Sequence, residues 1–135
     1  MKTHKLMYVL LTLFATAASA GEKINSEVKV NLLPYPNWSD AKGSIAAAQA
    51  SADPYQYIGC RITVNMNSGT PVRMLFCSAR TATGVAGYCS MLNPPQSIID
   101  QLTSLRETDI LWFFWNPNNG TCMEVNVDRG SGVTR

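Results

Sequence analysis

The chain has 135 residues, of which 46% are hydrophobic and 15% are charged, with a formal net charge of +2. This length suits one domain, and the ordinary apolar content argues against intrinsic disorder. No catalytic or cofactor motif rises above chance in the sequence. We therefore expect neither a cofactor nor a metal site.

Residues 1–20 are typical of a secretory signal peptide. Lys2 and Lys5 supply a positive start, residues 7–14 an apolar stretch, and residues 18–20 (ASA) a small-residue cleavage site. The apolar stretch is shorter than the ~20 residues that a membrane-spanning helix needs. The sequence therefore predicts cleavage after Ala20, a secreted or periplasmic protein and no membrane span.

The expected mature protein is a single domain over residues 21–135, with its core at about 26–128. Cleavage removes Lys2 and Lys5, so the eleven basic residues of the whole chain fall to nine, equal to the nine acidic residues. A chain without net charge or a basic run lacks the electrostatic signature of nucleic-acid or anionic-membrane binding. We expect neither partner.

The mature chain also lacks histidine, because His4 is the single histidine of the sequence and lies in the predicted signal. Ser-His-Asp and Cys-His catalysis both need an imidazole base, and most catalytic zinc sites use histidine ligands. The composition therefore favours a protein that is not an enzyme.

The first part of the mature chain gives weaker signals. Residues 27–33 (EVKVNLL) are interpreted as a strand, and residues 34–38 form a turn-rich aromatic stretch. Residues 43–51 (GSIAAAQAS) are ambiguous, because their alanines favour a helix but one large apolar residue cannot form a packing stripe.

A hairpin is predicted around Asn67-Ser68-Gly69. Residues 60–66 (CRITVNM) alternate between apolar and polar side chains, and the next strand runs through residues 72–78. Matching the apolar faces places Val72, Met74 and Phe76 beside Cys60, Ile62 and Val64. In that register Cys77 points away from Cys60, so these two cysteines should not bond.

Four cysteines in a small exported chain indicate two disulfides, and no CxxC pair suggests a metal or redox motif. A second three-residue loop, Ala82-Thr83-Gly84, leads into a strand over residues 85–91 and places Cys77 directly opposite Cys89. Opposite positions lie within disulfide reach. We therefore predict the bonds Cys77–Cys89 and Cys60–Cys122.

The rest of the chain predicts one helix and one hairpin. Asn93 and Pro94 are interpreted as the start of a helix that ends near Arg106. Its apolar stripe contains Ile98, Ile99, Leu102 and Leu105. Residues 109–115 (DILWFFW) and 121–128 (TCMEVNVD) then form strands around the turn 116–120 (NPNNG). The expected fold is mainly β: a small antiparallel sheet or sandwich with one packed helix, held by two disulfides.

Several of these segments resemble small secreted bacterial proteins of uncharacterised function, which are β-rich and carry two disulfides. The resemblance covers roughly residues 43–128 and depends on ASADPYQYIGC (50–60), the Cys77/Cys89 hairpin, the WFFW strand and NGTC (119–122). It implies a bacterial exported protein and adds no reaction, ligand or site residue.

The WFFW run is the most unusual feature for function. Trp112 and Phe114 share one face of a strand, and Phe113 and Trp115 share the other. One pair must belong to the core. The second pair is either exposed, as a platform for sugar rings or a partner protein, or buried under a second layer. The expected binding residues are Trp38, Tyr57, Trp112, Phe114 and Trp115.

The function predicted from these features is an exported, disulfide-stabilised binding protein for a protein or a glycan. Two alternatives remain open. Glu124 and Asp128 share a strand face and could serve a small carboxylate-only hydrolase of the glycosidase type. The chain could also be an inhibitor or immunity protein of a partner enzyme. Arg61 and Arg73, on neighbouring strands, either recognise an anion or form surface ion pairs.

Overall fold

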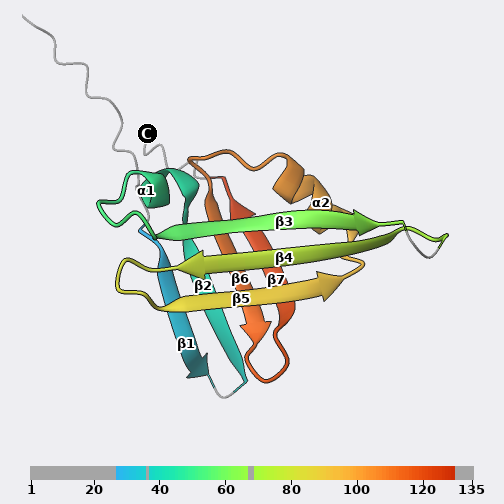
Figure 1. Ribbon diagram of the computed structural model, residues 1–135, viewed down its shortest axis with the longest axis horizontal. Coiled ribbons are helices and arrows are strands. Elements are labelled where there is room, and N and C mark those ends of the chain that lie inside the picture. The colour runs from blue at the N-terminus through green and yellow to red at the C-terminus, as the bar shows by residue number, and fades with distance from the viewer. Residues whose placement is uncertain (1–26, 36, 67–68, 130–135) are drawn as a thin grey trace, which may run out of the picture.

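The computed structural model describes residues 27–35, 37–66 and 69–129; the predicted signal peptide of residues 1–20 lies outside these ranges. Seven strands and two short helices follow one another along the chain (Figure 1). Their bounds are β1 Lys29–Tyr35, β2 Trp38–Ser44, α1 Ile45–Gln49, β3 Tyr57–Asn65, β4 Val72–Arg80, β5 Ala86–Leu92, α2 Gln96–Thr103, β6 Ile110–Asn116 and β7 Thr121–Asp128.

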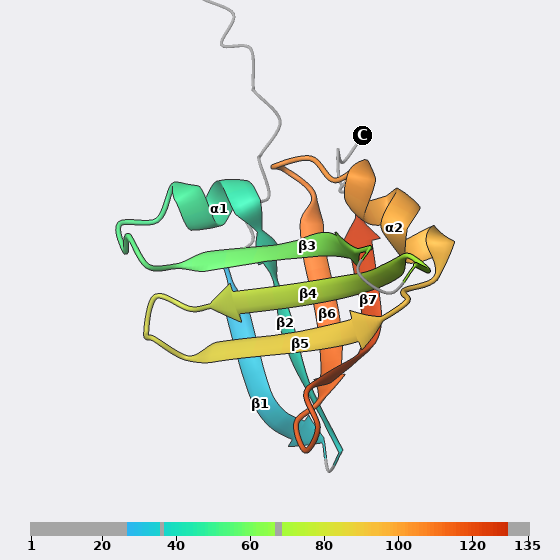
Figure 2. The same cartoon turned by 45° about the vertical axis from the view of Figure 1, so that its right-hand side comes forward.

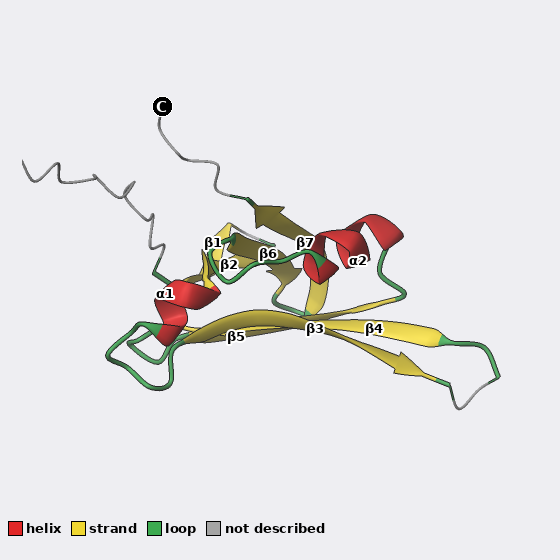
Figure 3. Ribbon diagram, turned by 90° about the horizontal axis from the view of Figure 1, so that it is seen from above, coloured by secondary structure: helices red, strands yellow, loops and turns green. Residues whose placement is uncertain are grey.

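Hydrogen bonds connect all seven strands into one sheet of order β1-β2-β6-β7-β5-β4-β3. Every neighbouring pair is antiparallel except β5 and β7, which meet in parallel at the single position Ser90↔Thr121. The sheet folds over at this narrow junction, so that β3, β4 and β5 lie across the other four strands (Figures 1 and 3). The mainly β class is confirmed; the sandwich form is not, because the hydrogen bonds define one sheet.

The core fills the space between the two parts of the folded sheet. Strands β4 and β6 alternate between buried and more exposed positions, as the period of a pleated strand requires, whereas five of the seven positions of β2 are buried. The buried hydrophobic residues of the strands are Ala41, Ile58, Leu75, Cys77, Ala79, Cys89, Leu111, Phe113, Trp115, Cys122 and Val125.

The predicted register of the β3–β4 hairpin is wrong by one residue. Matching the apolar faces predicts that Cys60 lies opposite Phe76, whereas Cys60 lies opposite Cys77 in the structure. Leu75, Cys77 and Ala79 form the buried row of β4, and Met74 and Phe76 face outward, half-buried. The last pair of the hairpin is Asn65↔Val72, so the connection is longer than the predicted three residues. A short hairpin loop fixes which residues of the two strands lie opposite each other, whereas a longer loop leaves this register open.

The predicted disulfide pairing is wrong as well. The structure contains the bonds Cys60–Cys77 and Cys89–Cys122. Cys77 does lie directly opposite Cys89, as predicted, but it also lies directly opposite Cys60 on its other side. A cysteine in a middle strand lies opposite one residue of each neighbouring strand. Its position opposite another cysteine therefore does not determine which cysteine it bonds. Cys89 instead bonds Cys122, which comes from the facing part of the sheet.

The structure has two helices, so the expectation of one packed helix is not confirmed. α1 begins after Ser44, whose hydroxyl accepts a hydrogen bond from the Ala47 amide at 3.1 Å. α2 is shorter than predicted and begins after Pro95, without a side-chain cap. Ile98 and Leu102 pack against the core, as the apolar stripe predicted. Both helices lie at the same end of β1, β2, β6 and β7 (Figure 2).

Asn93 does not cap α2, because it takes part in a different interaction. Its backbone has a positive φ of 47°, and its side-chain oxygen accepts a hydrogen bond from the Arg73 amide at 3.2 Å. Its own amide donates to the Arg73 carbonyl at 2.7 Å. Asn93 therefore extends the β4–β5 pairing by one residue and turns the chain towards the helix.

Candidate functional site

The aromatic strand β6 divides its side chains between two environments. Leu111, Phe113 and Trp115 are buried in the core, and Trp115 is 4% exposed. Trp112 and Phe114 point to the opposite face and remain half-buried. The predicted alternation is therefore confirmed, and one aromatic pair keeps access to solvent.

Trp38 joins this outward pair from the neighbouring strand β2. The ring centroids of Trp38 and Phe114 lie 5.0 Å apart, and those of Phe114 and Trp112 lie 4.6 Å apart, both in tilted arrangements. Such distances are typical of favourable aromatic contacts. Three rings thus form a continuous row across two strands. We call this row, together with Asp40 and Lys42 of β2, the indole face.

Polar groups of β1 and β2 hold the row in place. The Trp112 Nε1–H donates a hydrogen bond to Asp40 Oδ2 at 3.1 Å. Asn31 Nδ2 lies 3.2 Å from each oxygen of the same carboxylate. The Lys42 Nζ lies 4.7 Å from the centroid of the Trp112 ring, within the range of a cation–π interaction. Asp40 is only 7% exposed, so these donors compensate for the burial of its carboxylate.

Replacing Asp40 with alanine is expected to lower the free energy of unfolding by about 1–3 kcal/mol, since it leaves the half-buried indole N–H without its acceptor. Chemical denaturation of the Asp40→Ala variant, with tryptophan emission as a second readout, measures the effect. Glu124→Ala is the matched control, because the Glu124 carboxylate is exposed and bonds only its strand neighbour Asn126 among the described residues. Equal stability of the two variants would contradict this role for Asp40.

The two acidic residues singled out for hydrolysis lie far apart on β7. Glu124 and Asp128 are both exposed, and four residues separate them along the strand. At ~3.3 Å per residue this spacing is about 13 Å, beyond the ~5–9.5 Å between the paired carboxyl groups of glycosidases.

Strand β7 also contains a bulge at Met123, since Phe114 pairs with Glu124 but Trp115 pairs with Cys122. Met123 is therefore exposed and does not share the core face with Val125.

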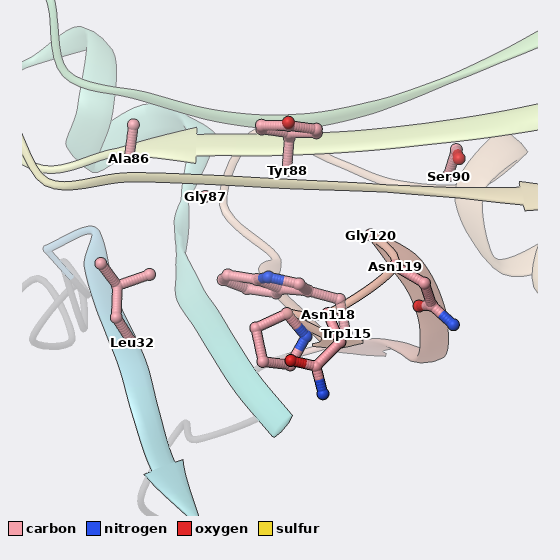
Figure 4. A pocket seen from close by; sticks show the side chains of 10 residues that line it. Leu32, Ala86, Gly87, Tyr88, Ser90, Trp115, Asn118, Asn119 and Gly120 are labelled. Atoms are coloured by element: carbon pink, nitrogen blue, oxygen red, sulfur yellow. The ribbon is translucent and has the colours of Figure 1, made fainter. Parts of the chain in front are cut away.

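A cavity of about 460 Å³ opens where β5 faces β1 and the β6–β7 turn (Figure 4). Trp115 lies at its inner wall near Leu32 and Asn118, whereas the ring of Tyr88 points away from the cavity on the other side of β5 (Figure 4). Every lining residue is uncharged. Trp115 fits here because Gly87 has no side chain: a Cβ at Gly87 would lie 2.4 Å from the indole ring. Trp115, one of the predicted binding residues, is thus mainly a core residue, and one edge of its ring lines the cavity.

Tyr57, the fifth predicted binding residue, belongs to neither the indole face nor the cavity. It lies at the start of β3, opposite Arg80, on the outer side of the three-stranded part of the sheet. Arg61 lies on the same side, with its guanidinium 5.2 Å from the centroid of the Phe76 ring. Arg73 instead donates a hydrogen bond to Gln96 of α2 at 2.8 Å. The two arginines therefore do not act as a pair.

The cysteines cluster closely enough to suggest metal ligands at first sight. The sulfur atoms of Cys77, Cys89 and Cys122 lie within 4.8 Å of one another. All four cysteines are in disulfides, however, so they offer no thiolates for a metal ion.

Sequence reasoning missed Asp40, Tyr88 and Arg80. Each becomes significant only through a neighbour distant in the sequence: Trp112 for Asp40, Gly59 and Ser78 of the same cross-strand row for Tyr88, and Tyr55 and Asp53 for Arg80. No local motif marks these positions.

No helix within the described ranges has the length and apolar character required to cross a membrane. Comparisons of the chain with protein-family models, with curated proteins and with solved structures gave no match.

Proposed function

We propose that this chain is an exported binding protein whose indole face takes a glycan. The observation that carries the proposal is the row Trp38–Phe114–Trp112 with polar groups beside it. Sugar rings offer an apolar face that stacks on aromatic rings and hydroxyl groups that need hydrogen-bond partners. The indole face combines both kinds of group on one rigid sheet.

Four further features support this reading over a catalytic one. The two disulfides suit an oxidising compartment, in agreement with the predicted signal peptide. The expected mature sequence has no histidine. The outward carboxylates of Glu124 and Asp128 on β7 lie too far apart for paired acid catalysis. Strand positions also hold aromatic side chains more firmly than loops, so little conformational entropy is lost on binding.

A binding measurement on two variants tests the proposal. A glycan panel identifies the tightest ligand of the purified protein, and calorimetry then compares the wild type with Trp112→Phe and Trp38→Phe. Each substitution reduces the stacking area, and we expect about tenfold weaker binding. The control Met123→Ala removes an exposed apolar side chain outside the row and should bind as the wild type does.

Two results would count against the indole face. The first is the absence of any glycan that binds in the panel. The second is a glycan whose affinity the Trp112 and Trp38 substitutions leave unchanged, because binding would then take place elsewhere on the protein.

A further inference from the structure

The outer side of β3, β4 and β5 differs in chemistry from the indole face. It carries Tyr57, Arg61, Phe76, Arg80 and Tyr88, and Tyr55 lies beside it in the preceding loop. We call this surface the tyrosine–arginine face. Its three tyrosines are the most exposed aromatic side chains of the described residues: Tyr88 is 75% exposed, Tyr55 66% and Tyr57 45%.

The strand positions of the tyrosine–arginine face carry positive charge. The outward positions of β3, β4 and β5 contain arginine and no carboxylate. Asp53 approaches from the preceding loop and pairs with Arg80 at 3.6 Å, whereas Arg61 has no ion-pair partner within the described ranges. On the opposite side of the molecule, Glu124 and Asp128 line β7. The zero net charge expected for the mature chain therefore conceals a locally basic surface.

The registers of the three strands place two small residues near the middle of this surface. Gly59, Ser78 and Tyr88 form one row, in which the first two side chains are small or absent. The rows on either side contain Tyr57 with Arg80, and Arg61 with Phe76. A Cβ at Gly59 would meet no atom within 4 Å, so the space above Gly59 is open.

We propose that the tyrosine–arginine face binds an acidic segment of a partner protein. Tyrosine and arginine are the residue types that contribute most at protein interfaces. Phe76 and the exposed aliphatic side chain of Leu92 add apolar area that a partner's side chains can cover. Arg61 supplies the unpaired charge that an acidic side chain would neutralise, and its guanidinium is already oriented by the Phe76 ring. This proposal is independent of glycan binding by the indole face.

The test uses three probes on the isotope-labelled protein, followed by NMR chemical shifts. They are a blocked peptide that repeats Glu-Glu-Leu, its Lys-Lys-Leu counterpart, and polygalacturonate as an acidic glycan. The acidic peptide should shift the signals of β3, β4 and β5 around Gly59, and the basic peptide should leave them in place. The shifts should weaken as the salt concentration rises, because exposed charges are screened.

Two variants locate the site without disturbing the core. Arg61→Glu reverses the charge of Arg61, and Gly59→Leu fills the open space above Gly59; each should weaken binding of the acidic peptide by about tenfold. Arg106→Glu makes the same charge change at an exposed position outside the face and should have no effect. The Arg61→Lys variant should retain part of the affinity.

Three outcomes would overturn the proposal. They are no shift with the acidic peptide, equal shifts with the basic peptide, and shifts around Gly59 with polygalacturonate alone. The last would assign the face to an acidic glycan. Since the indole-face variants Trp112→Phe and Trp38→Phe should leave peptide binding unchanged, this test and the glycan test can fail separately.

Discussion

Replacing Cys89 and Cys122 together with alanine is expected to lower the free energy of unfolding by about 4 kcal/mol. The bond closes a sequence separation of 33 residues, and the entropy of the unfolded chain rises with the length of the loop released. The bond also connects the two parts of the folded sheet where hydrogen bonding is weakest, since β5 and β7 share only Ser90↔Thr121.

The paired replacement of Cys60 and Cys77 is the matched control. That bond closes a separation of 17 residues, for which the same chain-entropy argument predicts about 3 kcal/mol. It also joins two strands that nine residue pairs already hold in register. Urea unfolding of both double variants gives the comparison, and peptide mapping of the wild type verifies the bonds. A larger loss for the Cys60/Cys77 variant would show that the junction does not depend on Cys89–Cys122.

Gly87→Ala is expected to destabilise the protein by about 2 kcal/mol or more, because overpacking a filled core forces side chains or backbone to move. The added Cβ would lie 2.4 and 2.6 Å from two carbons of the Trp115 indole and 3.3 Å from Val30. Trp115 is enclosed by the core and cannot retreat from β5 without displacing its neighbours. Its emission should therefore shift to longer wavelength as the ring moves towards the cavity.

Gly59→Ala makes the same chemical change on β3 where no atom lies within 4 Å of the new Cβ. Alanine is favoured over glycine inside a strand by about 0.5–1 kcal/mol, so this control should be neutral or slightly stabilising. Thermal or urea unfolding of the two variants gives their free energies of unfolding. The difference between them isolates the effect of close packing at Gly87 from the effect of replacing a strand glycine with alanine. If Gly87→Ala unfolded like Gly59→Ala, the packing of Trp115 on β5 would be looser than the structure indicates.

The two sheet faces suggest one molecule with two binding surfaces of different chemistry. The indole face offers tilted aromatic rings with a buried carboxylate, and the tyrosine–arginine face offers exposed phenols with a free guanidinium. The folded sheet turns these faces in opposite directions (Figure 3). A glycan and a protein partner could therefore bind at the same time without contact, which is a testable consequence of the two proposals together.

The last two strands and the turn glycines follow from the sequence, because local signals specify them, whereas β2, Trp38–Ser44, was not predicted. The predicted strands 109–115 and 121–128 differ by at most one residue from β6 and β7. Gly69, Gly84 and Gly120, which close the predicted loops, all have positive φ. The opposition of Cys77 and Cys89, and the division of the WFFW run between two faces, follow from the same two-residue period.

The disulfide pairing and the register of β3 on β4 depended on the tertiary structure. Both faces of β4 carry apolar side chains, so its sequence does not show which one is buried; the small row Leu75, Cys77 and Ala79 is inside because another part of the sheet covers it. In a regular strand, Cys122 and Val125 would point to opposite faces, because an odd number of positions separates them. The bulge at Met123 turns both side chains inward. Alternation and turn residues act over a few neighbours, and they determined the predicted strands but did not reveal β2. Which face is covered, and which of two adjacent cysteines bonds, depends on segments brought together by the fold at the β5–β7 junction.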